Sequence, residues 1–412
     1  MERKRTFFLA LSSYFIGYLY VCCMLFGFTD SDSAVEWYAL LFAAVFALWG
    51  NAIGKEKKPL GKDRLLFLAA MLLIALAISL GRCNATGGWE ILALHGAAAL
   101  WGLYRMGGDL GLEEPLFLVR DTIAALLLLP FGSFFLRIRT VFRGLVSCFR
   151  SISRPADKKR RQSILIVVLC LLAALPVLIG TAKLLTQADE NFGAFLSGIG
   201  GIFQWTLPDS AVTQLIRVLL SLPVSAYLYG LLAGSASRRT PDAAAAKGKI
   251  AGMQRLPAAA ACGVWGMFAA LYVLFFLVQA NNLLAVFRGE VPGTLTAANY
   301  ARSGFFQLCL VMGINFLLLG LGKLLTPQSR AGIWLAGILM VQSLLLAVTA
   351  GAKLGLYIHR FGFTPLRLLS AWGVLVLGAG CVLTLLGLAG KKHGFRSWVY
   401  FTVLTFTALC FY

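Results

Sequence analysis

Long apolar runs, most of them 17 to 23 residues, recur along the whole chain and are separated by short polar segments. Lysine and arginine fall overwhelmingly on alternate polar segments. A run of this length crosses a hydrocarbon layer of about 30 Å as an α-helix, and in lipid only helices or closed barrels satisfy every backbone hydrogen bond. The pattern therefore predicts an all-α fold, a polytopic transmembrane helical bundle.

Composition supports this prediction and excludes several other classes. Hydrophobic residues make up 59% of the chain and charged residues 13%, which is too apolar for a soluble domain of this size. The formal charge of +20 comes from basic residues beside apolar runs, so anionic lipid is the expected partner, and nucleic acid is not. The nine cysteines show no CxxC spacing, which argues against zinc and against a disulfide framework.

The positive-inside rule gives a topology with about 11 spans and a cytoplasmic N-terminus. On this assignment 29 of the 37 lysines and arginines lie on the inner side, 7 on the outer side and one, Arg217, within a span. The predicted spans are 7–28, 35–53, 65–81, 89–104, 163–182, 211–233, 258–279, 304–321, 331–352, 371–389 and 398–412.

One apolar run, Leu116 to Leu136, does not fit this alternation. If it crossed, the most basic stretch of the chain, Arg137 to Arg161, would lie outside. The part between Asp121 and Arg137 is interrupted by Pro130, and as a helix it would reach only about 22 Å. We therefore predict a re-entrant or interfacial segment; the alternative is that the run at 89–104 fails to cross.

The basic stretch also suggests how the chain is divided. We predict an N-terminal group of membrane helices over 1–136, a basic cytoplasmic linker over 137–162 and a C-terminal membrane domain over 163–412. A second flexible loop, Ser235 to Leu256, is too short to be a folded soluble domain.

Two motifs lie in predicted outward loops of the C-terminal part. Residues 300–306 read Tyr-Ala-Arg-Ser-Gly-Phe-Phe, followed by Gln307, and residues 361–367 read Phe-Gly-Phe-Thr-Pro-Leu-Arg. They resemble motifs of a bacterial family of uncharacterised polytopic inner-membrane proteins, the domains of unknown function of the 4173/4153 type. An acid is common in that family where Gln307 stands here. The resemblance implies a bacterial inner-membrane location and no particular chemistry.

The residues of these motifs are Tyr300, Arg302, Phe305, Thr364 and Arg367. An arginine beside aromatic residues suits recognition of phosphate or carboxylate, because the guanidinium offers a planar fork of donors. The motifs thus form a candidate outward anion or lipid head-group site. The alternative is that they are ordinary interfacial anchors. Thr364 and Pro365 are also typical of a helix start.

Four polar residues fall inside predicted spans. Arg217 is costly in hydrocarbon, and either pairs with Asp209 or serves a function. His95 is either a packed hydrogen-bonding residue or a titrating group. Asn315 and Gln342 are expected to form interhelical hydrogen bonds or to line a substrate path. No predicted span has an internal Asp or Glu, which argues against a proton-coupled pump.

Neither catalytic residues, nor cofactor sites, nor metal sites are predicted, so enzymatic activity is not expected. The favoured hypothesis is a non-enzymatic sensing, scaffolding or envelope-associated membrane component. Its expected partners are membrane lipids, with anionic lipid at the cytoplasmic basic loops, and a protein within the membrane. The alternative is a transporter or flippase of an anionic amphiphile, with Arg217, Arg302 and Arg367 along its path.

Overall fold

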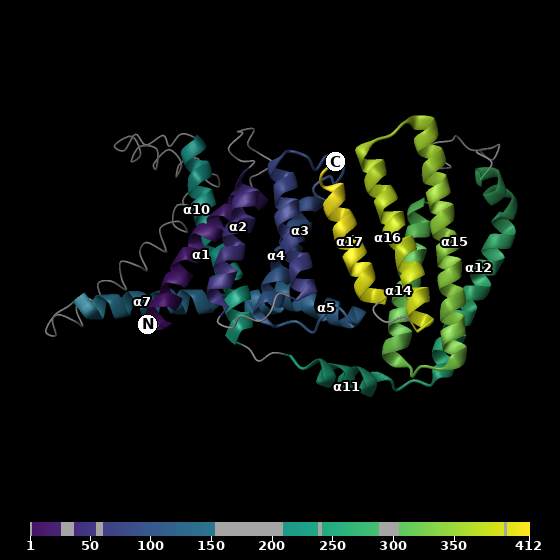
Figure 1. Ribbon diagram of the computed structural model, residues 1–412, viewed down its shortest axis with the longest axis horizontal. Helices are drawn as coiled ribbons and strands as arrows, with labels where there is room; N and C mark the ends of the chain where they lie inside the picture. Colours follow the sequence, from purple (N-terminus) through teal and green to yellow (C-terminus); the bar gives the residue numbers. More distant parts are fainter. Residues whose placement is uncertain are drawn as a thin grey trace, which may run out of the picture. The chain divides into compact units, whose positions relative to one another are not determined.

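The computed structural model describes residues 2–25, 37–54, 61–152, 209–237, 241–287, 305–390 and 394–412 (Figure 1). In this part of the chain every regular element is a helix and there is no strand. The predicted all-α class is confirmed for these residues. The predicted span at 163–182, together with Tyr300 and Arg302, lies outside them.

Seven of the described helices are long and apolar enough to cross a membrane. The segments are Arg5–Met24, Pro115–Gly132, Thr213–Ser237, Ala258–Ala280, Phe305–Leu325, Arg330–Phe361 and Pro365–Leu388. A shorter apolar helix is α2, Trp37–Ile53. These helices fit a multi-pass membrane protein, and the count of about 11 spans stays a prediction.

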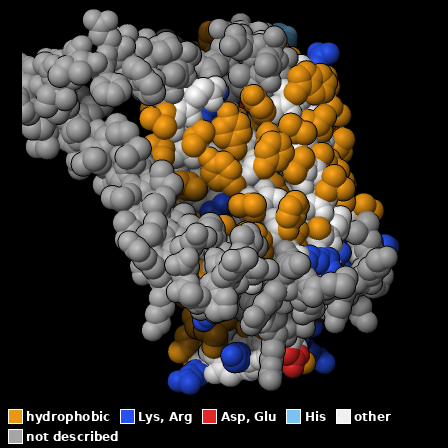
Figure 2. All heavy atoms as spheres, turned by 90° about the vertical axis from the view of Figure 1, so that its left-hand side faces the viewer, with side chains coloured by type: hydrophobic (Ala, Val, Ile, Leu, Met, Phe, Trp, Pro, Cys, Tyr) orange, Lys and Arg blue, Asp and Glu red, His pale blue; other side chains and the backbone are white. Residues whose placement is uncertain are grey.

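The outer surface of the helices is rich in large apolar side chains. Phe135, Leu277 and Trp334 are each at least 70% exposed. On the face shown in Figure 2, hydrophobic side chains cover much of the upper described surface, while most of the visible lysines and arginines lie lower down. So much exposed apolar surface would promote aggregation in water. It is the expected surface of helices that contact lipid chains.

The chain forms two compact units that do not follow chain order. The first consists of Met1–Lys55 and Leu127–Ser237, and the second of Glu56–Leu126 and Arg238–Tyr412. Each unit therefore combines residues from both sides of the basic linker. The helices that pack together within each unit come from distant parts of the sequence, and the predicted division at the basic linker stays a prediction.

In the first unit, α1 (Glu2–Met24) packs against α2, α7 (Phe134–Ile152) and α10 (Asp209–Ser237). Gly17 allows α1 to approach α10 closely, because a Cβ placed there would lie 2.8 Å from the Cβ of Ser225 and 2.9 Å from the carbonyl oxygen of Ser221. Small residues at a helix crossing are a common means of close packing in membranes. Here they set the spacing of α1 and α10.

The second unit contains nine of the described helices in a chain of neighbours. Helix α15 packs against α12, α14 and α16, while α16 contacts α17, α17 contacts α3, and α3 contacts α4. Their bounds are α3 Lys62–Ser79, α4 Trp89–Met106, α5 Pro115–Ile123, α11 Ala243–Met253, α12 Ala258–Phe287, α14 Phe305–Leu325, α15 Arg330–Phe361, α16 Pro365–Leu388 and α17 Gly394–Leu409.

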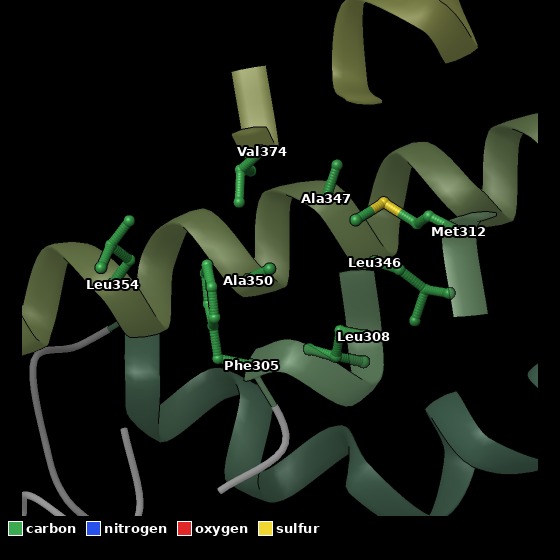
Figure 3. Close-up of a cluster of buried hydrophobic side chains, with 8 residues drawn as sticks. All are labelled: Phe305, Leu308, Met312, Leu346, Ala347, Ala350, Leu354 and Val374. Carbon is green, nitrogen blue, oxygen red and sulfur yellow. The ribbon is translucent and has the colours of Figure 1, made fainter. Parts of the chain in front are cut away.

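A buried apolar cluster holds α14, α15 and α16 together (Figure 3). Phe305, Leu308 and Met312 of α14 meet side chains of α15 and Val374 of α16. The α15 members are Leu346, Ala347, Ala350 and Leu354. Every member of the cluster is at most 9% exposed, so this contact fixes one side of the bundle.

The segment predicted to be re-entrant or interfacial is helical but irregular. It consists of α5, a π-helical turn at Ala124–Leu128, the short helix α6 (Leu129–Gly132) and then α7. In Figure 1, α5 runs crosswise to α3 and α4 in its own unit, and α7 runs crosswise to α1 and α2 in the other. The π turn and Pro130 interrupt regular helix in this stretch, as is usual for such features.

Candidate functional site

A cavity of about 390 Å³ lies within the second unit, among α12, α14, α15, α16 and α17. Its walls are mainly apolar, with Trp265 from α12, Leu319 from α14, Ala336 from α15, Leu388 from α16 and Trp398 from α17. Binding pockets for small molecules commonly have this size and an apolar lining with a few polar groups.

The two indoles of the cavity use their polar atoms elsewhere. Trp265 donates its Nε1 hydrogen to the carbonyl of Leu318 at 3.3 Å, and Trp398 donates to the carbonyl of Val376 at 2.8 Å. Trp398 also stacks on Phe316, with ring centroids 5.7 Å apart. The N–H groups of both indoles are thus already hydrogen-bonded, and the rings contribute apolar surface to the cavity wall.

Gly322 is needed for this arrangement of the wall. A Cβ at this position would lie 2.2 Å from the Cζ2 atom of the Trp265 ring. The ring of Trp265 thus packs directly against the backbone of α14.

Polar residues gather where α14 ends and α15 begins. Lys323 forms an ion pair with Glu114, with 2.6 Å between Nζ and Oε2, and both residues line the cavity. The neighbouring Glu113 pairs with Lys247 of α11 at 2.6 Å, and this contact raises the pKa of the exposed Lys247 ammonium. The polar end of the cavity therefore carries groups of both charge signs.

The start of α15 adds hydrogen-bonding groups to this polar end. Ser329 caps the helix, because its Oγ accepts the backbone N–H of Gly332 at 3.0 Å. Thr326 and Gln328 complete the polar lining beside it. A helix start concentrates partial positive charge and favours a nearby anionic group. An apolar cavity with such a polar end suits an amphiphile better than a fully polar solute.

Sequence reasoning missed this site. Glu113, Glu114 and Lys323 look like ordinary membrane-flanking charges, and nothing in their spacing indicates that they meet. Trp265 and Trp398 resemble core or interfacial aromatics. The one indication in the sequence was that Glu113, Glu114 and Lys323 all fall on the predicted inner side.

The structure places the predicted outward residues away from this cavity. Phe305 is 6% exposed and belongs to the apolar cluster of Figure 3. Thr364 and Pro365 begin α16 as predicted, with Thr364 at the N-cap position, although its side chain makes no capping hydrogen bond. Tyr300 and Arg302 lie outside the described residues, so a site shared with Arg367 stays a prediction.

Arg367 makes contacts within its own loop. Its Nη1 donates to the carbonyls of Phe361, at 2.9 Å, and Gly362. Its guanidinium lies over the ring of Tyr357, with 4.3 Å from Cζ to the ring centroid. These contacts hold the connection between α15 and α16, and Gly362 ends α15 with a positive φ of 78°.

Asn315 and Gln342 form the interhelical hydrogen bonds that the sequence predicts. Asn315 is fully buried; its Oδ1 accepts from the hydroxyl of Tyr272 at 2.7 Å, and its Nδ2 donates to Ser343 at 2.7 Å. Gln342 donates from Nε2 to the carbonyl of Ala269 at 3.0 Å. Both therefore join α15 and its neighbours, and a role in a substrate path stays a prediction.

Arg217 and His95 are placed in different units. Arg217 of α10 is 6% exposed, and its backbone carbonyl accepts a hydrogen bond from Ser221. His95 lies half-buried in α4. Neither residue lines the cavity.

A buried carboxylate lies in the segment predicted to be re-entrant or interfacial. Asp121 is fully buried within Pro115–Gly132, a segment long and apolar enough to cross a membrane. Its carboxylate accepts the backbone N–H of Leu110 at 2.9 Å and pairs with Arg120 at 2.8 Å. This segment was predicted to be re-entrant or interfacial, so the expectation that the predicted spans carry no internal acid stays a prediction.

Comparisons with known proteins give one match. A family model described as a domain of unknown function (DUF4153) matches residues 37–412. No curated protein and no solved structure matches the chain.

Proposed function

The chain belongs to the DUF4153 family, whose description assigns no activity, and we propose that it is a non-enzymatic membrane component that binds an anionic amphiphile. The apolar tail occupies the cavity among α12, α14, α15, α16 and α17. The head group lies at the polar end, beside Lys323 and the start of α15. The observation that carries this proposal is the apolar cavity with an ion pair at one end.

The polar end favours a head group with a phosphate or carboxylate. Such a group would interact with the Lys323 ammonium and with the partial positive charge at the start of α15. It would compete with Glu114 for Lys323, so binding exchanges one ion pair for another. That exchange gives the protein a means of sensing the ligand, because Glu114 lies directly before α5 while Lys323 lies in the last turn of α14.

The proposed location is the bacterial cytoplasmic membrane, with the N-terminus and the polar end of the cavity on the inner side. The distribution of basic residues supports this orientation. Helix α7 supports it too: exposed Arg139 and Arg143 lie beside exposed Phe135, Ile138 and Phe142. A helix with adjacent basic and apolar faces is suited to lie in an anionic membrane surface. The crosswise direction of α5 in Figure 1, which covers the first part of the 116–136 segment, favours the interfacial form of that segment.

Filling the cavity should block binding of the tail. We expect Leu319→Trp, which places an indole in the cavity wall, to reduce cross-linking of a phosphatidylglycerol with a photoactivatable acyl chain to cavity peptides by at least several-fold. The matched control is Leu317→Trp on the same helix, where the leucine is 61% exposed and does not line the cavity. Peptide mapping by mass spectrometry gives the cross-linked sites. Equal labelling of cavity peptides in both variants would reject the cavity as the lipid site.

An assay with the protein reconstituted into lipid vesicles distinguishes binding from transport. A transporter or flippase of this amphiphile would move a labelled phosphatidylglycerol between leaflets of protein-containing vesicles faster than in protein-free vesicles. The proposed sensing component binds the lipid without accelerating this movement.

The orientation has its own test. With Cys83 replaced by Ser, a cysteine at Gly289 should react with an impermeant maleimide added to intact cells, and a cysteine at Ala246 should react only after the cells are opened. The reason is that Gly289 falls in a predicted outward loop, whereas Ala246 belongs to α11 in a predicted inner loop. The reverse labelling pattern would invert the proposed topology.

A further inference from the structure

Two cysteines far apart in the sequence meet in the second unit. Cys83 lies in the loop between α3 and α4, and Cys410 directly follows α17. Figure 1 shows the C-terminal end of α17 beside this loop. The side chains of the two cysteines are close enough to affect each other's ionisation. An independent contact joins their neighbours, since Asn84 donates from Nδ2 to the backbone carbonyl of Tyr412 at 3.4 Å.

The loop that carries Cys83 is held in place on its other side. The Thr86 hydroxyl lies within hydrogen-bond distance of two acceptors, the carbonyl of Cys83 at 2.9 Å and the carboxylate of Glu90. Glu90 is 5% exposed and accepts the backbone N–H of Gly88 at 3.0 Å. These contacts restrict the Cys83 backbone, so the two thiols remain neighbours without a covalent link.

The two thiols differ in access. Cys410 is 0% exposed, whereas Cys83 is partly exposed, and both are free in this structure. The neighbouring Cys410 side chain holds the pKa of the Cys83 thiol below its ordinary value. A thiol with more thiolate character and better access reacts first in thiol–disulfide exchange. Cys83 is therefore the residue that an external oxidant meets.

We propose that Cys83 and Cys410 form a reversible disulfide that links the α3–α4 loop to the end of α17. This inference rests on the orientation given under the proposed function, which puts both residues on the outer side. That side is oxidising, whereas cytoplasmic thiols are kept reduced. The reaction partner is an oxidant that itself carries a disulfide, either a protein or a small molecule.

The reaction is two exchanges. The Cys83 thiolate attacks one sulfur of the oxidant disulfide, which forms a mixed disulfide and releases one oxidant thiolate. The Cys410 thiol then loses its proton and attacks Sγ of Cys83, which forms the internal disulfide and releases the second oxidant thiolate. Both thiolates are protonated by the two protons that the cysteines lose. The cysteines give up two electrons, and the oxidant disulfide is reduced to two thiols.

The link would act on a helix that also contributes to the cavity. Trp398 of α17 lines the cavity, and Arg396 at the other end of α17 pairs with Asp63 of α3 at 2.8 Å. Tyr400 donates to the same carboxylate at 2.7 Å. The disulfide and this ion pair together would fasten α17 to α3 at both ends.

The test maps cysteine states in the full-length protein. Cells are quenched in acid, free thiols are alkylated, and peptides are analysed without reduction. We expect a cross-linked peptide containing Cys83 and Cys410 in untreated cells, and its loss when intact cells are first treated with an impermeant phosphine reductant. Cys83→Ser should remove the peptide, whereas Cys381→Ser, a control at a buried cysteine of α16, should leave it unchanged.

A second measurement uses the purified protein with oxidised glutathione. We expect the same cross-link and a melting temperature several degrees above that of the reduced protein, with no such difference in Cys83→Ser. Free thiols at both positions in cells and after oxidation would overturn the proposal. A cross-link in the purified protein alone would also overturn it, and would contradict the orientation. Neither result would affect lipid cross-linking at the cavity, which tests the proposed function separately.

Discussion

Gly17→Leu should strongly destabilise the first unit. Even the first carbon of the new side chain would lie 2.8 Å from the Cβ of Ser225 and 2.9 Å from backbone atoms of α10. Backbone atoms cannot rotate away, so α1 and α10 must separate. Overpacking of this kind costs about 3 kcal/mol or more. We expect a loss of folded protein in detergent and a melting temperature lowered by about 10 °C.

Gly266→Leu is the matched control for this variant. It is also a glycine in a long apolar helix, α12, but a Cβ there meets no atom within 4 Å. Its melting temperature should stay close to that of the wild type. If the two variants melted together, the close contact between α1 and α10 would not be the feature that limits stability.

Asp109 should make the protein more stable in mild acid than at neutral pH. This residue lies between α4 and α5, and burial raises the pKa of its carboxyl to about 6. Asp121 and Asp63 raise the pKa further, while Arg64 and backbone hydrogen bonding lower it. The hydroxyl of Tyr104 is also close to these three carboxylates. The folded protein therefore holds a proton at Asp109 that the unfolded chain loses at lower pH.

The direction of the pH effect follows from this difference. Below the pKa of Asp109 in the unfolded chain, near 4, the carboxyl is protonated in both states and does not destabilise the folded protein. Between about pH 4 and pH 6 the Asp109 carboxyl is protonated in the folded state and ionised in the unfolded state, so the free energy of unfolding falls as the pH rises through this range. The two-unit difference corresponds to about 3 kcal/mol. Above pH 6 to 7 this contribution is constant.

Asp109→Asn should remove most of this dependence. We expect the variant to melt higher than the wild type at pH 7.5 and to lose the rise in melting temperature that the wild type shows between pH 7 and pH 5. Asp242→Asn is the control, because Asp242 is exposed and Asn also caps a helix start. An unchanged pH profile in Asp109→Asn would place the titrating group elsewhere.

Several features of the helices could be predicted from the sequence because they depend on local chemistry. The start of α16 at Thr364 and Pro365 is one, since an N-cap residue followed by proline favours a helix start. The end of α15 is a contrasting case. The apolar pattern predicts a span that ends at Ala352, but the helix continues to Phe361. Hydropathy marks the part of a helix that lies in lipid, and Gly362 decides where the helix ends.

The interhelical partners of Asn315 show a different limit. A polar residue in an apolar run must find a hydrogen-bond partner, so the sequence predicts that one exists. It does not say that the partners are Tyr272 and Ser343, because these lie on two other helices. Their identity depends on how α12, α14 and α15 pack.

The sequence alone determined the helical membrane class, because lipid allows few ways to satisfy a backbone and long apolar runs report directly on that solvent. It also determined the family, through motifs that are read residue by residue. Only the tertiary structure brought Lys323 to Glu114, Cys83 to Cys410 and Asp109 to Asp63 and Asp121. Lys323 and Glu114, Cys83 and Cys410, and Asp109 and Asp63 each come from segments that are distant in the chain. Hydropathy and spacing describe neighbours along a helix, whereas sites in a bundle form between helices whose pairing is set by side-chain packing.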